Sequence, residues 1–139
     1  MKPMRLALLL AVLLAAGTAA ADQAAPVTVK TLITTDKTVL GQKLVLPKRD
    51  PVLIVSTYEI APGARLPRHE HPFSRYAYVL QGDLTVEFDG GLQKQYHAGD
   101  FIVEAVGSWH FGMNPGKLPA RLLVIDQVEA GQPATILAK

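Results

Sequence analysis

Three of the four histidines fall in two short segments, and their spacing is suited to binding a metal ion. His69 and His71 flank Glu70, and His110 lies much further along the chain. Side chains of a strand alternate between its two faces, so His69 and His71 point the same way in an extended segment and Glu70 points the opposite way. Two imidazoles from one strand and a third from a distant strand can share one cation and leave coordination positions open. Glu70 is a poor ligand candidate, because it points away from both neighbouring histidines. For the His-x-His pair alone, hydrogen-bonded or surface histidines are an equally good interpretation.

The rest of the chain predicts β-strands to position these histidines. Short runs rich in β-branched and aromatic residues are separated by glycine and proline about every 8–12 residues, as in an all-β sandwich or barrel. Helical periodicity is absent. Asp89-Gly90-Gly91 predicts a tight hairpin. The expected strands are 27–34, 38–46, 52–60, 64–69, 74–80, 84–88, 93–97, 101–104, 109–112 and 121–128.

The residues around the histidines resemble the two motifs of the cupin family. The first motif is matched by Gly63, His69, His71 and Gly82, and the second by Gly99, Gly107, His110 and Asn114, with Ala105 in place of a proline. The resemblance implies an all-β fold, a single small jelly-roll barrel with the histidines pointing into its mouth. It also implies that His69, His71 and His110 bind a divalent transition metal, which is Fe, Mn, Ni, Cu or Zn.

The chain departs from the family motif at one metal ligand. Where the motif has a glutamate, this sequence has Arg75, and the next residue, Tyr76, is not a carboxylate either. A guanidinium ~6 Å from a divalent cation, at an effective dielectric of ~20, would repel it by roughly 5 kcal/mol. Three interpretations follow: Arg75 pairs with a carboxylate, it holds an anionic ligand, or there is no metal. Cupins with three histidine ligands are a known variant, which favours the metal; we expect Arg75 to bind a small anion. Candidate carboxylate partners are Glu59, Glu87 and Glu104.

The first residues resemble an export signal. Lys2 and Arg5 precede an apolar run over 6–16, and small residues lead to Ala21. The run is shorter than the ~20 residues of a membrane span. We therefore expect 1–21 to be a signal peptide, 22–139 to be one cupin domain with its core at about 27–128, and the mature protein to be periplasmic or secreted, with no membrane association.

Composition excludes several classes of function. The chain has 139 residues, enough for one domain and not for two, and it contains no cysteine, which rules out disulfides and thiolate ligands. The net charge of +2 comes from the two basic residues of the predicted signal, so the remaining 12 basic and 12 acidic residues balance. A nucleic-acid partner is not expected, because phosphate binding needs a clustered basic surface.

Two functions remain open from the sequence. One is an exported cupin that binds a divalent metal and a small anionic ligand without turnover, and the other is a metal-dependent enzyme of dioxygenase or isomerase type acting on a small organic acid. The missing glutamate favours the first. We also expect a homodimer, since the β-type runs before residue 60 could pair with a second copy and cover exposed strand edges.

Overall fold

The structure is a computed structural model, and it describes residues 27–139. The described residues fall into two units, one that includes residues 27–30 and one that spans Thr31–Lys139. In the first unit, residues 27–30 are exposed and belong to no strand. The predicted signal peptide, 1–21, lies outside the described residues. The second unit contains every strand discussed below.

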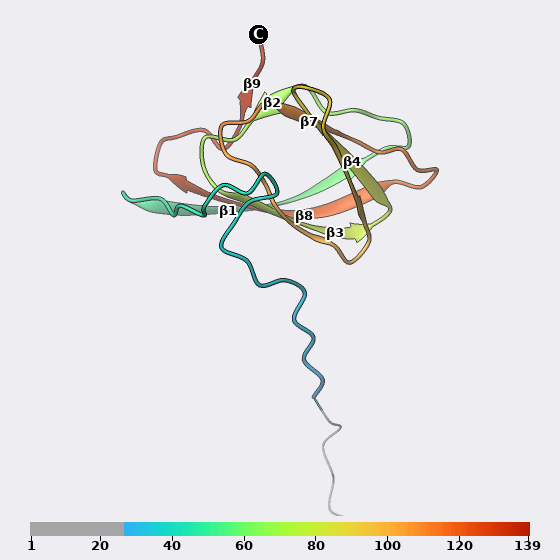
Figure 1. Cartoon of the computed structure of the whole chain (residues 1–139), viewed down its shortest axis with the longest axis horizontal. Coiled ribbons are helices and arrows are strands. Elements are labelled where there is room, and N and C mark those ends of the chain that lie inside the picture. Colours follow the sequence, from blue (N-terminus) through green and yellow to red (C-terminus); the bar gives the residue numbers. More distant parts are fainter. Residues whose placement is uncertain (1–26) are drawn as a thin grey trace, which may run out of the picture. The chain divides into compact units, whose positions relative to one another are not determined.

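Within residues 27–139, nine antiparallel strands form two sheets that face each other (Figure 1). The order is β1-β8-β3-β6 in the four-stranded sheet and β5-β4-β7-β2-β9 in the five-stranded sheet. This arrangement confirms the all-β jelly-roll fold. The bounds are β1 Pro51–Ile60, β2 His69–Glu70, β3 Arg75–Gln81, β4 Asp83–Phe88, β5 Gln93–His97, β6 Phe101–Val103, β7 His110–Met113, β8 Ala120–Glu129 and β9 Ile136–Leu137.

The core lies between the sheets and follows the alternation of strand side chains. In β3, Ala77 and Val79 are buried while Tyr76 and Tyr78 are only half-buried on the opposite face, as their spacing predicts. Arg75 shares the inward face with Ala77, so a charged side chain stands in line with the apolar core. The remaining buried apolar side chains come mainly from β4, β6 and β8: Leu84, Val86, Phe88, Ile102, Val103, Leu122, Val124 and Val128.

Three of the expected strands are wrong. The segment 27–34 forms none, and 38–46 contributes only a single bridge, between Lys37 and Lys43. The run 64–69 reaches the sheet through one bridge, from Arg65 to Met113, before β2 begins. A β-prone run becomes a strand only when it pairs with a partner over several residues, and within the described part of the chain these runs form at most isolated bridges. Conversely, β9 pairs with β2 although its sequence gave no strand signal.

Glycines with positive φ occupy several of the turns between strands. Gly63, Gly82, Gly99 and Gly107 all have positive φ, a conformation that glycine adopts without steric cost. At Gly82 a Cβ atom would also lie 2.8 Å from the carbonyl oxygen of Pro119.

Within residues 27–139, no helix has the length and apolar character needed to span a bilayer.

Candidate metal centre

The fold brings His69, His71 and His110 together. His69 begins β2 and lies opposite His110 at the start of β7, and His71 follows directly after β2. One ring nitrogen from each histidine lies within 4.8 Å of the others, and all three side chains are buried. Glu70, only half-buried, is outside this cluster. The fourth histidine, His97, is exposed and lies 2.7 Å from Asp83 Oδ1.

Hydrogen bonds to backbone carbonyls determine which ring nitrogen of each histidine keeps its lone pair. The Nδ1 atoms of His69, His71 and His110 lie 2.6, 3.0 and 2.8 Å from the carbonyl oxygens of Pro67, Ala134 and Ser108, in that order. A carbonyl oxygen only accepts hydrogen bonds, so each Nδ1 carries the proton and donates it. Each neutral ring therefore presents the lone pair of Nε2, the form in which imidazole binds a metal.

One carboxylate lies beside the cluster. Glu104 Oε2 is 3.2 Å from Nε2 of His71 and 3.2 Å from Nε2 of His110. Nε2 of His71 is buried and has no hydrogen-bond partner in the described part of the chain. Glu104 follows β6, and its backbone nitrogen donates to the carbonyl oxygen of Arg75 over 2.9 Å. Glu104 therefore lies directly across from Arg75, immediately after the end of the neighbouring strand β6.

Burial and the contacts between Glu104 and the histidines shift the pKa values of these side chains in opposite directions. Burial lowers the pKa of His69 to about 4, so its ring stays neutral. Burial also opposes the charged form of His110, but contact with Glu104 outweighs it and raises the pKa of His110. The pKa of Glu104 falls well below its usual range, because its contacts with His110 and His71 outweigh the effect of burial. The site thus holds an ionised carboxylate among imidazoles.

Arg75 is held by an acid from another strand. Its Nε donates to Asp126 Oδ1 over 2.6 Å, and its Nη2 donates to Asp126 Oδ2 over 3.1 Å and to Thr135 Oγ1 over 3.0 Å. This is the first of the three interpretations, pairing with a carboxylate. The partner is not one of the three glutamates considered from the sequence, because the register between β3 and β8 places Asp126 opposite Arg75.

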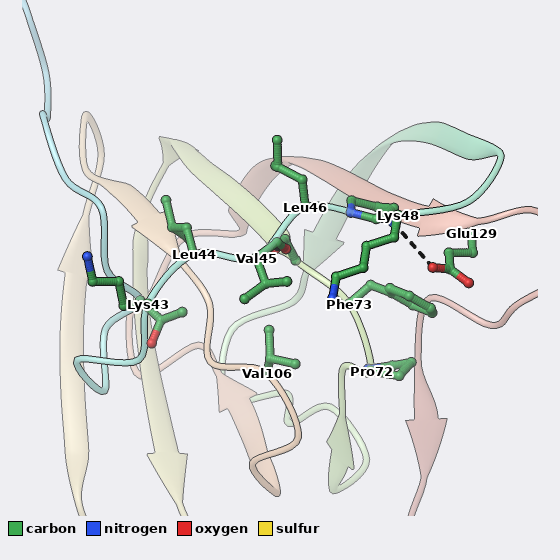
Figure 2. Close-up of a pocket in the computed structure, with 12 residues that line it drawn as sticks. Lys43, Leu44, Val45, Leu46, Lys48, Pro72, Phe73, Val106 and Glu129 are labelled. Atoms are coloured by element: carbon green, nitrogen blue, oxygen red, sulfur yellow. Dashed lines mark hydrogen bonds between the residues drawn. The ribbon is translucent and has the colours of Figure 1, made fainter.

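The space around the histidines is small. A cavity of about 20 Å³, bordered by His69, His110, Glu104 and Arg75, has room for about one water-sized atom. A neighbouring pocket of about 150 Å³ is bordered by His69, Arg75, Tyr58, Thr135 and Leu137. A larger groove of about 360 Å³ lies elsewhere, between the segment around Val45 and Phe73, and none of the three histidines borders it (Figure 2).

Comparison with known proteins identifies the family. The family model described as "Cupin domain" matches residues 56–126, about half of the chain. The chain belongs to the cupin family.

Two curated relatives match this cupin over similar stretches. It is 33% identical over 66 residues to "Tetracenomycin polyketide synthase protein TcmJ" from Streptomyces glaucescens, which covers 47% of this chain and 44% of the relative. It is 35% identical over 71 residues to "Germin-like protein 1" from Brassica napus, covering 48% of this chain and 34% of the relative. The matched parts thus span less than half the length of either relative.

Solved structures support the same fold. Oxalate oxidase in complex with the substrate analogue glycolate is 26% identical, covers 62% of this chain and 46% of that chain, and gives a TM-score of 0.51. The polyketide cyclase RemF from Streptomyces resistomycificus is 22% identical over 66% of this chain and 65% of that chain, with a TM-score of 0.53, and shows the fold alone.

The motif match predicted that the three histidines of this cupin lie together. It did not predict that Glu104 lies beside them. Glu104 lies just before Ala105 in the second motif, where the motif specifies no carboxylate. Its approach to the histidines depends on the pairing of β3 with β6, which no local pattern encodes. Asn114, the last motif residue, lies in the turn after β7, where its side-chain nitrogen donates to the carbonyl oxygens of Ile60 and Leu118.

Proposed function

We propose that this cupin binds one divalent transition metal (Fe, Mn, Ni, Cu or Zn) through His69, His71 and His110, and holds a small anionic ligand beside it. The observation that carries the metal site is the donation of all three Nδ1–H groups to backbone carbonyls, which leaves three buried Nε2 lone pairs close together. Such orientation by a hydrogen bond behind the ligand is typical of metal-binding histidines. A bound metal would supply Lewis acidity at the barrel mouth.

Metal titration of the stripped protein tests the site. We expect His69→Ala, His71→Ala and His110→Ala each to weaken Mn²⁺ or Ni²⁺ binding at least about 100-fold in calorimetry, because loss of an outer hydrogen-bond partner alone typically costs 10–100-fold. His97→Ala is the matched control, since His97 is exposed and lies outside the cluster. Wild-type protein that takes up no divalent metal would refute the proposal.

The anionic ligand is supported by the pocket of about 150 Å³ beside His69 and Arg75. A cavity of that size holds about six non-hydrogen atoms, as benzene does, which suits a two- or three-carbon acid. Arg75 uses Nε and Nη2 for Asp126 and Thr135, leaving its Nη1 donors for a carboxylate. Glycolate bound to a related cupin enzyme, oxalate oxidase, is consistent with such a ligand.

Calorimetry with glycolate and oxalate on the metal-loaded protein tests the anionic ligand. Arg75→Lys keeps the charge but loses the planar donor pair, so we expect about tenfold weaker anion binding with metal affinity nearly unchanged. Equal anion affinity in wild type and Arg75→Lys would assign Arg75 to the ion pair with Asp126 alone.

A second candidate function is an enzyme of dioxygenase or isomerase type that acts on a small organic acid. The likeness to oxalate oxidase favours it. Oxygen uptake and product analysis with glycolate and oxalate, on metal-loaded protein, separate the two functions. A binding protein shows stoichiometric occupancy without turnover, whereas an enzyme consumes the acid in a reaction that His110→Ala abolishes.

We further propose a homodimer, formed along the free edge of β1. Val52, Leu53, Ile54 and Val55 are consecutive exposed residues of this edge strand, and Leu53 and Val55 are 61% and 56% exposed. Open apolar edges are covered in native proteins. The exposed segment 27–34, which forms no strand here, offers a β-prone stretch for a second copy. Light scattering should give twice the monomer mass, and Val55→Lys should lower it, whereas Leu118→Lys, at an exposed apolar residue outside β1, should not.

Export to the periplasm or medium is proposed from the sequence of residues 1–21. N-terminal sequencing of protein recovered from the periplasm should begin at or near Asp22. An intact N-terminus in cytoplasmic protein would refute it.

A further inference from the structure

We infer that Glu104 is a fourth protein ligand of the metal centre, supplied from the end of β6 rather than from the position that Arg75 occupies. The inference rests on the proposed metal site. Oε2 of Glu104 is 3.2 Å from Nε2 of both His71 and His110, so one oxygen faces two of the three ligand nitrogens. Its side chain is 18% exposed and extends into the cluster from the sheet opposite β2 and β7.

The contact between Glu104 and the histidines calls for a cation. Because Nδ1 carries the proton in each ring, Nε2 of His71 and of His110 presents a lone pair to a carboxylate oxygen. Three electron-rich atoms at this spacing repel one another unless a proton or a metal ion lies among them. A proton serves one nitrogen at a time, and Nε2 of His71 is buried without a hydrogen bond. One metal ion held by the three imidazoles would also give the carboxylate beside His71 and His110 a positive partner.

The neighbouring charged groups leave the negative charge of Glu104 available to pair with a metal ion. Arg75 is the nearest fixed cation, but its guanidinium forms a two-point ion pair with Asp126. Asp126 and Glu104 are thus two carboxylates beside one guanidinium, that of Arg75. Burying the negative charge of Glu104 without a partner of its own is costly. A divalent ion at the histidines would supply the missing positive charge, and its attraction to Glu104 would offset its repulsion from Arg75.

The position of Glu104 explains how the site accommodates an arginine. Glu104 and Arg75 are opposite each other on adjacent strands, joined by the 2.9 Å bond from the Glu104 nitrogen to the Arg75 oxygen. Moving the carboxylate across this strand pair keeps it on the inward face of the same sheet. Arg75 then pairs with Asp126 and borders the pocket beside the metal site.

Calorimetric titration of Glu104→Gln with Mn²⁺ and Ni²⁺ tests this assignment. Carboxylates suit Mn²⁺ whereas imidazoles suit Ni²⁺, so we expect Mn²⁺ affinity to fall at least about 100-fold and Ni²⁺ affinity markedly less. Glu70→Gln is the matched control, because Glu70 adjoins two of the histidines in sequence but its side chain lies on the opposite face of β2. It should change neither affinity more than about threefold.

The other outcomes are equally distinct. Unchanged Mn²⁺ affinity in Glu104→Gln, with binding lost in His110→Ala, would overturn the role of Glu104 and leave the histidine site standing. An equal loss for both metals together with a lower melting temperature of the metal-free protein would assign Glu104 a structural role and also overturn it. Absence of metal binding by the wild type would refute the site itself. If Glu104→Gln fails to fold, Glu104→Asp, which retracts the carboxylate by one methylene, replaces it: selective loss of Mn²⁺ supports the assignment and unchanged affinity overturns it.

Discussion

Arg75 and Asp126 face each other across β3 and β8, and each side chain is only 5% exposed. Removing one partner leaves the other charge buried and unpaired. We therefore expect Asp126→Asn to lower the free energy of unfolding by about 3–5 kcal/mol in urea denaturation of the metal-free protein. The double variant Arg75→Met/Asp126→Leu should recover most of this loss, because it removes both charges. A double variant no more stable than Asp126→Asn would contradict this account.

The carbonyl of Ala134 fixes His71 through the bond to its Nδ1, so the segment carrying β9 should control metal affinity. We expect deletion of residues 133–139 to weaken Mn²⁺ binding about 10–100-fold, the usual effect of losing a hydrogen bond behind a metal ligand. Circular dichroism should show the other strands retained. Thr135→Val is the control, since it removes the hydroxyl that lies 3.0 Å from Arg75 Nη2 and 3.5 Å from His71 Nδ1 but keeps the Ala134 carbonyl. Full metal affinity in the truncated protein would show that this bond is dispensable.

Gly82 joins β3 to β4 at a positive φ and in close contact with Pro119. Gly82→Ala should cost about 2–4 kcal/mol of unfolding free energy, since it adds a steric clash to the conformational penalty. Gly91→Ala is the matched control: Gly91 also has positive φ, but an added Cβ would meet nothing within 4 Å. That variant should cost only about 1 kcal/mol. Equal losses in the two proteins would mean that the backbone near Pro119 relaxes freely.

Tyr96 has a hydroxyl without a hydrogen-bond partner among residues 27–139, and burial raises its pKa to about 12. Its charged form is disfavoured by the fold, so stability present below pH 10, the ordinary value for tyrosine, should decline as the pH rises toward 12. Tyr96→Phe should remove this alkaline loss and leave stability near pH 7 almost unchanged. Melting temperatures from pH 7 to 12 check both expectations. A wild type and variant that lose stability in parallel above pH 10 would contradict them.

Local chemistry explains which features could be read from the sequence. The clustering of the three histidines and the positive-φ glycines were predictable, because both follow from residue types at fixed spacing. The inward face of β3 followed from alternation. By contrast, Glu104 near the histidines and Asp126 opposite Arg75 depend on strand register, which is set by contacts distant in sequence. The absence of strands at 27–34 and 38–46 has the same origin, because a strand needs a partner.

The three acceptors behind the histidines are all main-chain oxygens, at Pro67, Ala134 and Ser108. A side-chain substitution at any of these residues leaves its carbonyl in place. The tautomers are thus protected against most point mutations, while insertions or deletions in the three connecting segments would displace the oxygens. Sequence drift in this protein should therefore be tolerated more readily than changes of loop length around its histidines.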